Sequence, residues 1–364
     1  MTDPGGGRRI RLVVLFGGRS AEHEVSCVTA VSVLKALDPR RYDVVPVGIT
    51  HDGGWVLADE AQRLLQAGGV DALPPALEAR GTGLEPFETI ATDPAAPVVV
   101  LPLLHGPFGE DGTVQGLCEL AGVPYVGSGV LGSAVAMDKL VAKQLMERAG
   151  LAVPRYLGVR DDQVTAGLPA RVEAELGWPV FVKPANLGSS VGVSKATDAA
   201  GLRKAVAEAA DYDEWVIVEE AIRGREIECG VLGDLDPQAS VPGEVVPSRD
   251  FYDYEDKYVD GAAELLVPAP LLPGVTAEVQ RLAVATFRAV RAEGMARVDF
   301  FYEEDGRGLL VNEVNTIPGF TPISMYPRMW EASGVPYPEL LDRLVQLALD
   351  RQARRTGRVG RGRG

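Results

Sequence analysis

Residues 297–325 read RVDFFYEEDGRGLLVNEVNTIPGFTPISM, and this stretch decides how the fold is interpreted. Two apolar runs, at 298–302 and 308–314, flank an acidic turn around Gly306. Short apolar runs on either side of a turn predict a β-hairpin, here with a slightly long loop. The second run leaves through Thr-Ile-Pro-Gly-Phe-Thr-Pro, which has too many turn-forming residues for an ordinary strand exit.

Polar side chains on this hairpin are predicted to project from one small area of sheet. Since side chains alternate between the two faces of a strand, Arg297 and Asp299 share one face. Glu313 and Asn315 likewise share a face of the second strand, with Glu313 roughly opposite Asp299. Mg²⁺ prefers oxygen ligands and usually takes one or two carboxylates together with substrate phosphates. A solvated sheet face would explain Asp299 alone, but the group as a whole favours a magnesium-nucleotide site.

Composition argues against several classes of protein. The chain has 364 residues, of which 46% are hydrophobic and 24% charged, as in a globular protein with two or three domains. Its net charge of −15 argues against nucleic acid or an anionic membrane as a partner. The three cysteines lie far apart and no apolar stretch is long enough to span a membrane, so we expect a cytoplasmic protein. Residues 351–364 hold six arginines and no acidic residue, which predicts a disordered basic tail.

The N-terminal region has the pattern of an α/β domain. The apolar run 10–16 ends in a double glycine, as a buried parallel strand does before a tight turn. These glycines do not form GxGxxG, which argues against a dinucleotide-binding oxidoreductase. Glu22, in the first turn of the next helix, could favour the helix dipole or face a ligand amine. A second buried run, 97–104, ends at His105, which either stabilises a turn or lies where open α/β sheets bind ligands, and a short strand is expected at 123–130.

The next region contains candidate nucleotide contacts. Lys183 lies in an otherwise apolar strand, 178–184, where an ammonium group is costly unless it meets an anion. The following loop, Gly-Ser-Ser-Val-Gly at 188–192, would let backbone N–H groups approach a phosphate closely. It is not a Walker A motif, because GK[ST] is missing. A later strand ends in Glu219 and Glu220, which could accept hydrogen bonds from adenine or ribose, or could simply form salt bridges.

Six segments of the chain carry a resemblance to a known family. They are LFGGRSAEHEVS, LLHGPFGEDGTVQG, MDK, PVFVKPANLGSSVGVSK, FYDYEDKY and RVDFF…VNEVNTIPGFTPIS. In this order the set resembles the D-alanine–D-alanine ligases of the ATP-grasp superfamily. The resemblance implies mixed α/β and α+β architecture, with a Rossmann-like N-terminal domain at 1–130 and a two-lobed ATP-grasp fold. The lobes would span 131–222 and 223–350, and the resemblance does not cover 52–97 or the basic tail.

The resemblance also implies site residues. Phosphate, adenine and ribose would be held by Lys139, Lys183, Gly188, Ser189, Ser190, Glu219, Glu220, Ala221, Ile222, Glu226, Lys257 and Asn312. Two Mg²⁺ or Mn²⁺ ions would be bound by Asp299, Glu313 and Asn315, in agreement with the hairpin argument. The amino acids would meet Glu22, His105, Arg297, Gly319, Ser324 and Met325. The catalytic set would be Glu22, Ser189, Tyr258 and Arg297, in which Glu22, Ser189 and Tyr258 link a lid at 251–258 to the site.

The implied reaction is the synthesis of D-alanyl-D-alanine for peptidoglycan. ATP would phosphorylate one D-alanine to an acyl phosphate, which the amine of a second D-alanine would attack. The protein would work in the cytoplasm as a homodimer, without a nucleic-acid or membrane partner. The alternatives are a D-alanine–D-lactate ligase, another ATP-grasp carboxylate–amine ligase, or a regulator that binds ATP without turnover. By analogy, the tyrosine-bearing DYEDKY segment favours the amide product over the ester.

Overall fold

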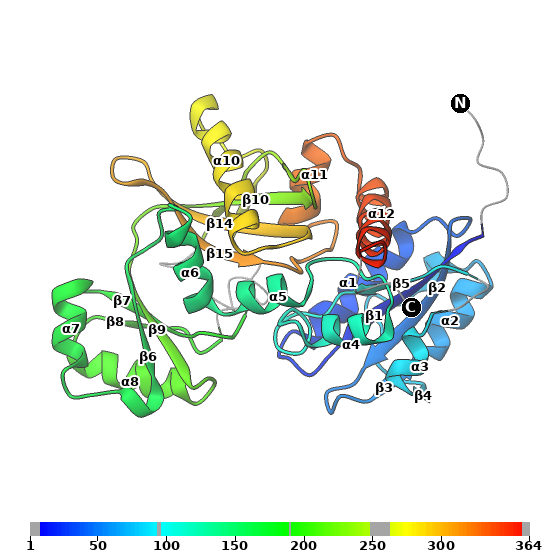
Figure 1. Ribbon diagram of the computed structural model, residues 1–364, viewed down its shortest axis with the longest axis horizontal. Coiled ribbons are helices and arrows are strands. Elements are labelled where there is room, and N and C mark those ends of the chain that lie inside the picture. The colour runs from blue at the N-terminus through cyan, green and yellow to red at the C-terminus, as the bar shows by residue number, and fades with distance from the viewer. Residues whose placement is uncertain (1–7, 93–95, 189–190, 248–262, 359–364) are drawn as a thin grey trace.

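The computed structural model describes residues 8–92, 96–188, 191–247 and 263–358, which form three β-sheets (Figure 1). The sheet nearest the N-terminus, blue in Figure 1, has five strands in the order β4-β3-β2-β1-β5. These strands are β1 (Ile10–Gly17), β2 (Tyr42–Ile49), β3 (Trp55–Leu57), β4 (Thr82–Leu84) and β5 (Val98–Pro102). Around them lie α1 (His23–Ala36), α2 (Asp59–Gln66), η1 (Val70–Ala72), α3 (Pro86–Ile90) and α4 (Thr113–Ala121).

The centre of this first sheet is parallel and buried. Strand β1 pairs in parallel with both β2 and β5, and its residues 12–16 are fully buried. A parallel sheet is covered on both faces, which explains the continuous apolar run. The stretch 52–97, which the family resemblance does not cover, adds β3 and β4 at one edge of the sheet. Both strands pair in the antiparallel sense. The strand expected at 123–130 is wrong, because the only pairing there is a single parallel bridge between Tyr125 and Val100.

The second sheet has four antiparallel strands in the order β6-β9-β7-β8, at the lower left of Figure 1. Its alternating valines, among them Val180 and Val182, are buried under two helices. The elements are β6 (Tyr156–Arg160), η2 (Asp161–Gln163), α7 (Leu168–Glu175), β7 (Val180–Pro184), β8 (Ser194–Ala196), α8 (Ala199–Ala210) and β9 (Trp215–Glu220). Helices α5 (Val130–Met137) and α6 (Lys139–Arg148) connect it to the first sheet, and Asp138 caps α6 by accepting from two backbone N–H groups.

The third sheet contains the predicted hairpin. Its order is β13-β12-β10-β14-β15, with β11 beside β10. The elements are β10 (Arg225–Gly233), β11 (Gln238–Ala239), β12 (Gly243–Val246), β13 (Glu264–Leu266), α10 (Pro273–Ala289), β14 (Gly294–Glu303), β15 (Gly308–Asn315), α11 (Met325–Ala332) and α12 (Tyr337–Thr356). The hairpin of β14 and β15 is confirmed, including its register, since Asp299 pairs with Glu313 and Arg297 with Asn315.

The last helix, α12, packs between the first and third sheets (Figure 1). Its apolar face joins the core of the first sheet, since Leu340 and Leu344 belong to the same buried cluster as Leu12 and Phe16. The prediction of a disordered tail from residue 351 is wrong for 351–356, which continue α12. Its arginines are ordered because they find carbonyl and carboxylate partners, described below, whereas residues 359–364 lie outside the described part of the chain.

Each sheet falls within one of the three predicted segments, whose boundaries at residues 130 and 222 remain a proposal. In the described part of the chain, no helix combines the length and the apolar character needed to cross a membrane.

Candidate active site

A cavity of about 850 Å³ lies where the three sheets meet. Most of the predicted site residues line it: Glu22, His105, Lys139, Lys183, Gly188, Glu219, Glu220, Ile222, Glu226, Arg297, Asp299, Asn312, Glu313, Asn315, Gly319, Ser324 and Met325. Ala221 is not among the lining residues, and its backbone N–H donates to the Pro179 carbonyl. The remaining predicted site residues, Ser189, Ser190, Lys257 and Tyr258, lie outside the described residues.

The hairpin brings its polar residues together as the alternation argument predicts. Arg297 Nε and Nη2 each donate to one oxygen of Asp299 at 2.7 Å, and Arg297 Nε also lies 3.2 Å from Glu228 Oε2. Asn315 Nδ2 donates to Asp299 Oδ2 at 2.9 Å. Burial opposes the charge on Arg297, but the neighbouring carboxylates outweigh it and hold the pKa of the guanidinium well above its ordinary value.

The donors around Asp299 fit a divalent cation that also binds a ligand. Carboxylates directly opposite each other in a sheet, such as Asp299 and Glu313, repel unless a cation lies between or beside them. Within the described ranges, no three His, Cys, Asp or Glu side chains are grouped closely enough to enclose a metal ion. With Asn315, the pair forms an open set of oxygen donors, of the kind Mg²⁺ uses when phosphate oxygens complete its coordination.

Two buried lysines share one carboxylate at the end of the cavity between the second and third sheets. Lys183 Nζ lies 2.5 Å from Glu219 Oε2, and Lys143 Nζ lies 2.8 Å from Glu219 Oε1. Lys143 also donates to the Asn312 carbonyl at 3.0 Å, so it joins the second sheet to the third. Burial disfavours the charge on Glu219, but the two ammonium groups outweigh it and lower its pKa to about 2. Glu219 therefore stays charged at neutral pH.

Lys143 is not among the site residues predicted from the sequence. It is only 1% exposed, and burial lowers its pKa in spite of Glu219. A signal existed, because Lys143 follows Lys139 by four residues and so lies on the same face of α6. Lys139 Nζ donates to the Leu187 carbonyl at 2.6 Å and lies 3.9 Å from Glu313 Oε2. One face of α6 thus supplies Lys139 to the cavity wall and Lys143 to the buried pair behind it.

The opposite end of the cavity has two neighbouring carboxyl groups, Glu22 and Glu110. Glu110 Oε1 accepts from the Gly106 N–H at 2.7 Å. Burial, followed by repulsion from Glu22, raises the pKa of Glu110 to about 8. At neutral pH Glu110 therefore holds its proton, which reduces the repulsion from Glu22 beside it. Glu110 is not among the predicted site residues, although this residue lies in the loop that follows His105.

His105 and Gly188 close this end of the cavity. His105 Nδ1 lies 3.0 Å from the Ile317 carbonyl, which can only accept, so Nδ1 carries the proton. Its Nε2 is then an acceptor, buried and without a hydrogen-bond partner among the described residues. A Cβ added at Gly188 would lie 3.3 Å from Glu22 Oε2, so a glycine here lets the loop pass close to that carboxylate.

The structure distinguishes the two alternatives for Glu220, a contact with adenine or ribose and a salt bridge, and it shows how the segment after the hairpin is held. The Glu220 side chain forms salt bridges with Arg155 at 2.8 Å and Arg307 at 2.7 Å, which supports the salt-bridge interpretation. Ser324 Oγ accepts from the Thr321 N–H at 3.1 Å, and a Cβ added at Gly319 would lie 3.1 Å from it. The backbone at Gly319 is therefore kept close to the Ser324 hydroxyl at the cavity wall.

Comparisons with known proteins agree with this arrangement. The family models described as D-ala D-ala ligase N-terminus and D-ala D-ala ligase C-terminus match residues 11–128 and 145–346. Curated D-alanine–D-alanine ligases from Kineococcus radiotolerans and Streptomyces griseus are 53% and 51% identical, each over 94% of this chain and over 97% and 94% of their own lengths.

Solved structures give the same result. The D-alanine–D-alanine ligase from Coxiella burnetii superposes with a TM-score of 0.79 at 38% identity, covering 96% of each chain. The VanG D-Ala:D-Ser ligase from Enterococcus faecalis has a TM-score of 0.81 at 34% identity, over 94% of this chain and 100% of that one. The fold class is thus confirmed as a Rossmann-like sheet followed by a two-lobed ATP-grasp fold, and the chain belongs to the D-alanine–D-alanine ligase family.

Proposed function

We propose that this ligase uses ATP to join two D-alanine molecules inside the cavity described above, for peptidoglycan synthesis in the cytoplasm. The observation that carries the proposal is the meeting of three charge arrangements around one cavity. Lysines crowd around Glu219, oxygen donors surround Asp299, and Glu22 shares its end with Glu110. These arrangements suit a triphosphate, a divalent cation and an amino acid in that order.

The nucleotide is proposed to lie between the second and third sheets. Lys139 and Lys183 would contact its phosphates, because both ammonium groups border the cavity and are held by groups that an anion can replace. Glu226 and the backbone near Ile222 would contact ribose and adenine. Asp299, Glu313 and Asn315 would hold two Mg²⁺ or Mn²⁺ ions, which neutralise phosphate charge during transfer.

The first step forms an acyl phosphate. The ammonium group of the first D-alanine would bind the Glu22 carboxylate beside Glu110, with His105 Nε2 as a further acceptor. Bound in this way, the D-alanine would have its carboxylate directed toward the lysines. The carboxylate would attack the γ-phosphorus of ATP, and ADP would leave. Positioning and charge neutralisation account for most of the catalysis in such transfers.

The second step forms the peptide bond. The amine of the second D-alanine, once deprotonated, attacks the acyl carbon and expels phosphate. Arg297 and the Gly319 N–H would stabilise the oxyanion that develops. Ser324 and Met325 would form the wall that receives the second D-alanine. Ser189 and Tyr258, which lie outside the described residues, are proposed to link the lid to Glu22 so that water cannot hydrolyse the acyl phosphate.

Phosphate release tests the proposal directly. The protein is incubated with ATP and Mg²⁺ plus D-alanine, L-alanine, or D-alanine with either D-lactate or D-serine, and the products are identified by mass. We expect phosphate release in every mixture that contains D-alanine and none with L-alanine. The main product should be D-alanyl-D-alanine. An ester with D-lactate as the main product at neutral pH would assign the chain to the lactate branch. Binding of ATP without release under any condition would contradict catalysis altogether.

We further propose that the protein is a homodimer. Light scattering of the purified chain should give twice the mass of one chain, and the mass of a single chain at micromolar concentration would contradict this.

A further inference from the structure

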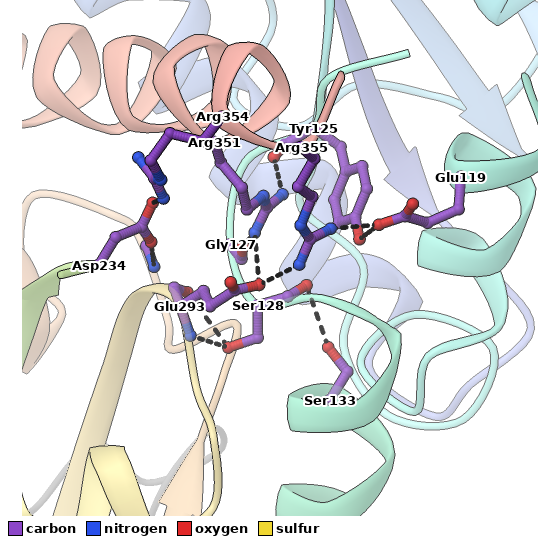
Figure 2. Close-up of polar contacts among 11 residues, drawn as sticks. Glu119, Tyr125, Gly127, Ser128, Ser133, Asp234, Glu293, Arg351, Arg354 and Arg355 are labelled. Carbon is purple, nitrogen blue, oxygen red and sulfur yellow. Dashed lines mark hydrogen bonds and ion pairs between the residues drawn. The ribbon is translucent and has the colours of Figure 1, made fainter. Parts of the chain in front are cut away.

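A second cluster of buried charge lies away from the cavity, around three arginines near the end of α12 (Figure 2). Arg351 is 3% exposed, and its Nη2 donates to the Tyr125 carbonyl at 2.5 Å while Nη1 donates to the Gly127 carbonyl. Its guanidinium also stacks 4.3 Å from the centre of the Tyr125 ring. One arginine thereby fixes both backbone and side chain of the segment that follows α4.

The same cluster holds the third sheet. Glu293 Oε2 lies 3.5 Å from Arg351 Nη1 and accepts from Arg355 Nη2 at 2.7 Å. Arg354 Nη2 pairs with Asp234 Oδ2 at 2.7 Å, and Asp234 Oδ1 accepts from the backbone N–H of Gly294 at 2.9 Å. Because Gly294 is the first residue of β14, these arginines fix the start of the strand that carries Arg297 and Asp299.

Between these two attachments the backbones are in direct contact. Ser128 Oγ accepts from the Glu293 N–H at 3.1 Å and lies 3.2 Å from the Glu293 carbonyl, to which it can donate (Figure 2). A Cβ added at Gly294 would lie 3.2 Å from three backbone atoms of Gly127, and Gly294 has a φ of +73°. Only glycine fits such an approach easily, so the backbone at Gly127 lies directly against the start of β14, with the Ser128 hydroxyl bonded to the residue beside it.

We call the contact of residues 125–128 with Arg351 and the start of β14 the junction. It lies at the base of both walls of the amino-acid end of the cavity. On one side, Tyr125 bridges Val100 of β5, the strand that leads to His105. On the other side, Arg297 lies three residues along β14 from Gly294, or about 10 Å in an extended strand. The end of the cavity at Lys183 and Glu219, by contrast, is built from the second and third sheets, and the segment that Arg351 joins to β14 belongs to neither.

We infer that Arg351 is a positioning residue for D-alanine, because it holds the first and third sheets at the spacing that a substrate between Glu22 and Arg297 requires. The inference rests on the proposed function. It assigns to the end of α12 a role in the affinity for D-alanine and none in the affinity for ATP. Misplacement of catalytic groups by about 1 Å can cost as much as 10²-fold in rate, so a small shift at the junction is sufficient.

The test compares KM values in variants of the junction. Arg351→Met keeps the apolar stem but removes every donor, and should raise KM for D-alanine roughly tenfold while KM for ATP changes less than about twofold. Arg351→Lys keeps the charge but cannot reach both carbonyls, and should give an intermediate value. Ser128→Ala weakens the same junction from the other side and should raise KM for D-alanine in the same direction. Binding of ADP by calorimetry should be unchanged in all three variants.

The matched control is Arg343→Met, which removes an exposed arginine of the same helix whose partner in the described part of the chain is Glu339. It should change neither KM value. Circular dichroism and the melting temperature identify any variant that does not fold, and the milder Arg351→Lys and Ser128→Ala then decide the question. Equal increases in both KM values, or unchanged KM values in folded variants, would overturn the inference. Failure of the proposed function would appear separately, as absence of dipeptide with the unmodified protein.

Discussion

Two clusters of charge differ in one instructive respect. Around α12, three arginines meet three carboxylates and two carbonyls, and none of these groups lines the cavity described above (Figure 2). Around the cavity, Lys183 lies on Glu219 and Arg297 on Asp299, and all four side chains also line a space of about 850 Å³. Pairs of the first kind stand apart from that space. In the second kind, an incoming ion can take the place of either member of a pair.

Counting the charges supports this distinction. Among the residues that the structure describes, eight carboxyl groups but only four lysine or arginine side chains line the cavity. We therefore expect ligands to exchange with the protein's own ions, phosphate replacing Glu219 as the partner of Lys183 and a metal ion replacing Arg297 as the partner of Asp299. A buried ion pair is weak evidence for stability in itself, and the space beside it indicates whether it serves binding.

The largest effect is expected from a carboxylate that has the cavity beside it. Glu313→Gln removes one charge from the proposed metal ligands and should lower kcat by roughly 10²–10³-fold, since such charge stabilisation is worth several kcal/mol. The fold should remain intact. Glu339→Gln, on the exposed face of α12, is the control and should have normal activity. A Glu313→Gln enzyme with normal turnover and normal Mg²⁺ dependence would refute the metal assignment.

A smaller loss of rate is expected at Arg297. Arg297→Ala removes the proposed oxyanion donor and should lower kcat by roughly 10²-fold, with little change in KM for ATP. It also leaves Asp299 and Glu228 without their shared cation, so the melting temperature should fall as well. Addition of Mg²⁺ should recover more of the melting temperature than of kcat. A loss that appears mainly in KM for ATP would argue against the oxyanion role.

Lys143 offers the counterpart of the Arg351 test. In Lys143→Met, Lys183 becomes the only cation beside Glu219 in the described part of the chain. Phosphate should then replace Glu219 as the partner of Lys183 less easily, so KM for ATP should rise roughly tenfold, or about 1.4 kcal/mol. KM for D-alanine should stay near its normal value. The double variant Lys143→Met with Glu219→Gln removes the competing carboxylate and should recover part of the ATP affinity. If the two changes are simply additive, Lys143 does not act through Glu219.

The smallest effect concerns pH and Glu110, whose pKa is raised from 4.5 to about 8. Because the folded pKa lies above the unfolded one, the folded state holds more protons between these values, and stability falls as pH rises through that window. Glu110→Gln cannot titrate. Its melting temperature should therefore fall less than that of the unmodified protein between pH 6 and 9, by a few degrees. Parallel melting curves against pH would contradict the raised pKa.

The local features of the chain could be predicted from sequence. The hairpin and its register follow from period-two alternation on both sides of a glycine turn, so the pairing of Asp299 with Glu313 needed no tertiary information. Where a residue acts through distant partners, prediction failed. The carboxyl group of Glu110 is significant only because the fold buries it beside Glu22, and no local pattern encodes that burial.

The tail prediction failed for a related reason. Arginines without nearby acidic residues look solvated in the sequence, but their partners are Glu119, Asp234 and Glu293, which are distant along the chain. A pattern was present nevertheless, because Arg351 continues the spacing of the buried Leu344 and Ala348 on one face of α12. For residues 351–356 the helical spacing of buried residues therefore predicts the structure better than the arginine content does.

The place of α12 in the core of the first sheet has a consequence for synthesis of the protein. The core that contains Leu12 and Phe16 also contains Leu340 and Leu344, which are made much later. A chain still attached to the ribosome therefore has an incomplete apolar core beside its first sheet until α12 has been made. Contacts so far apart in sequence form slowly. We expect nascent chains that stop before α12 to depend on chaperones.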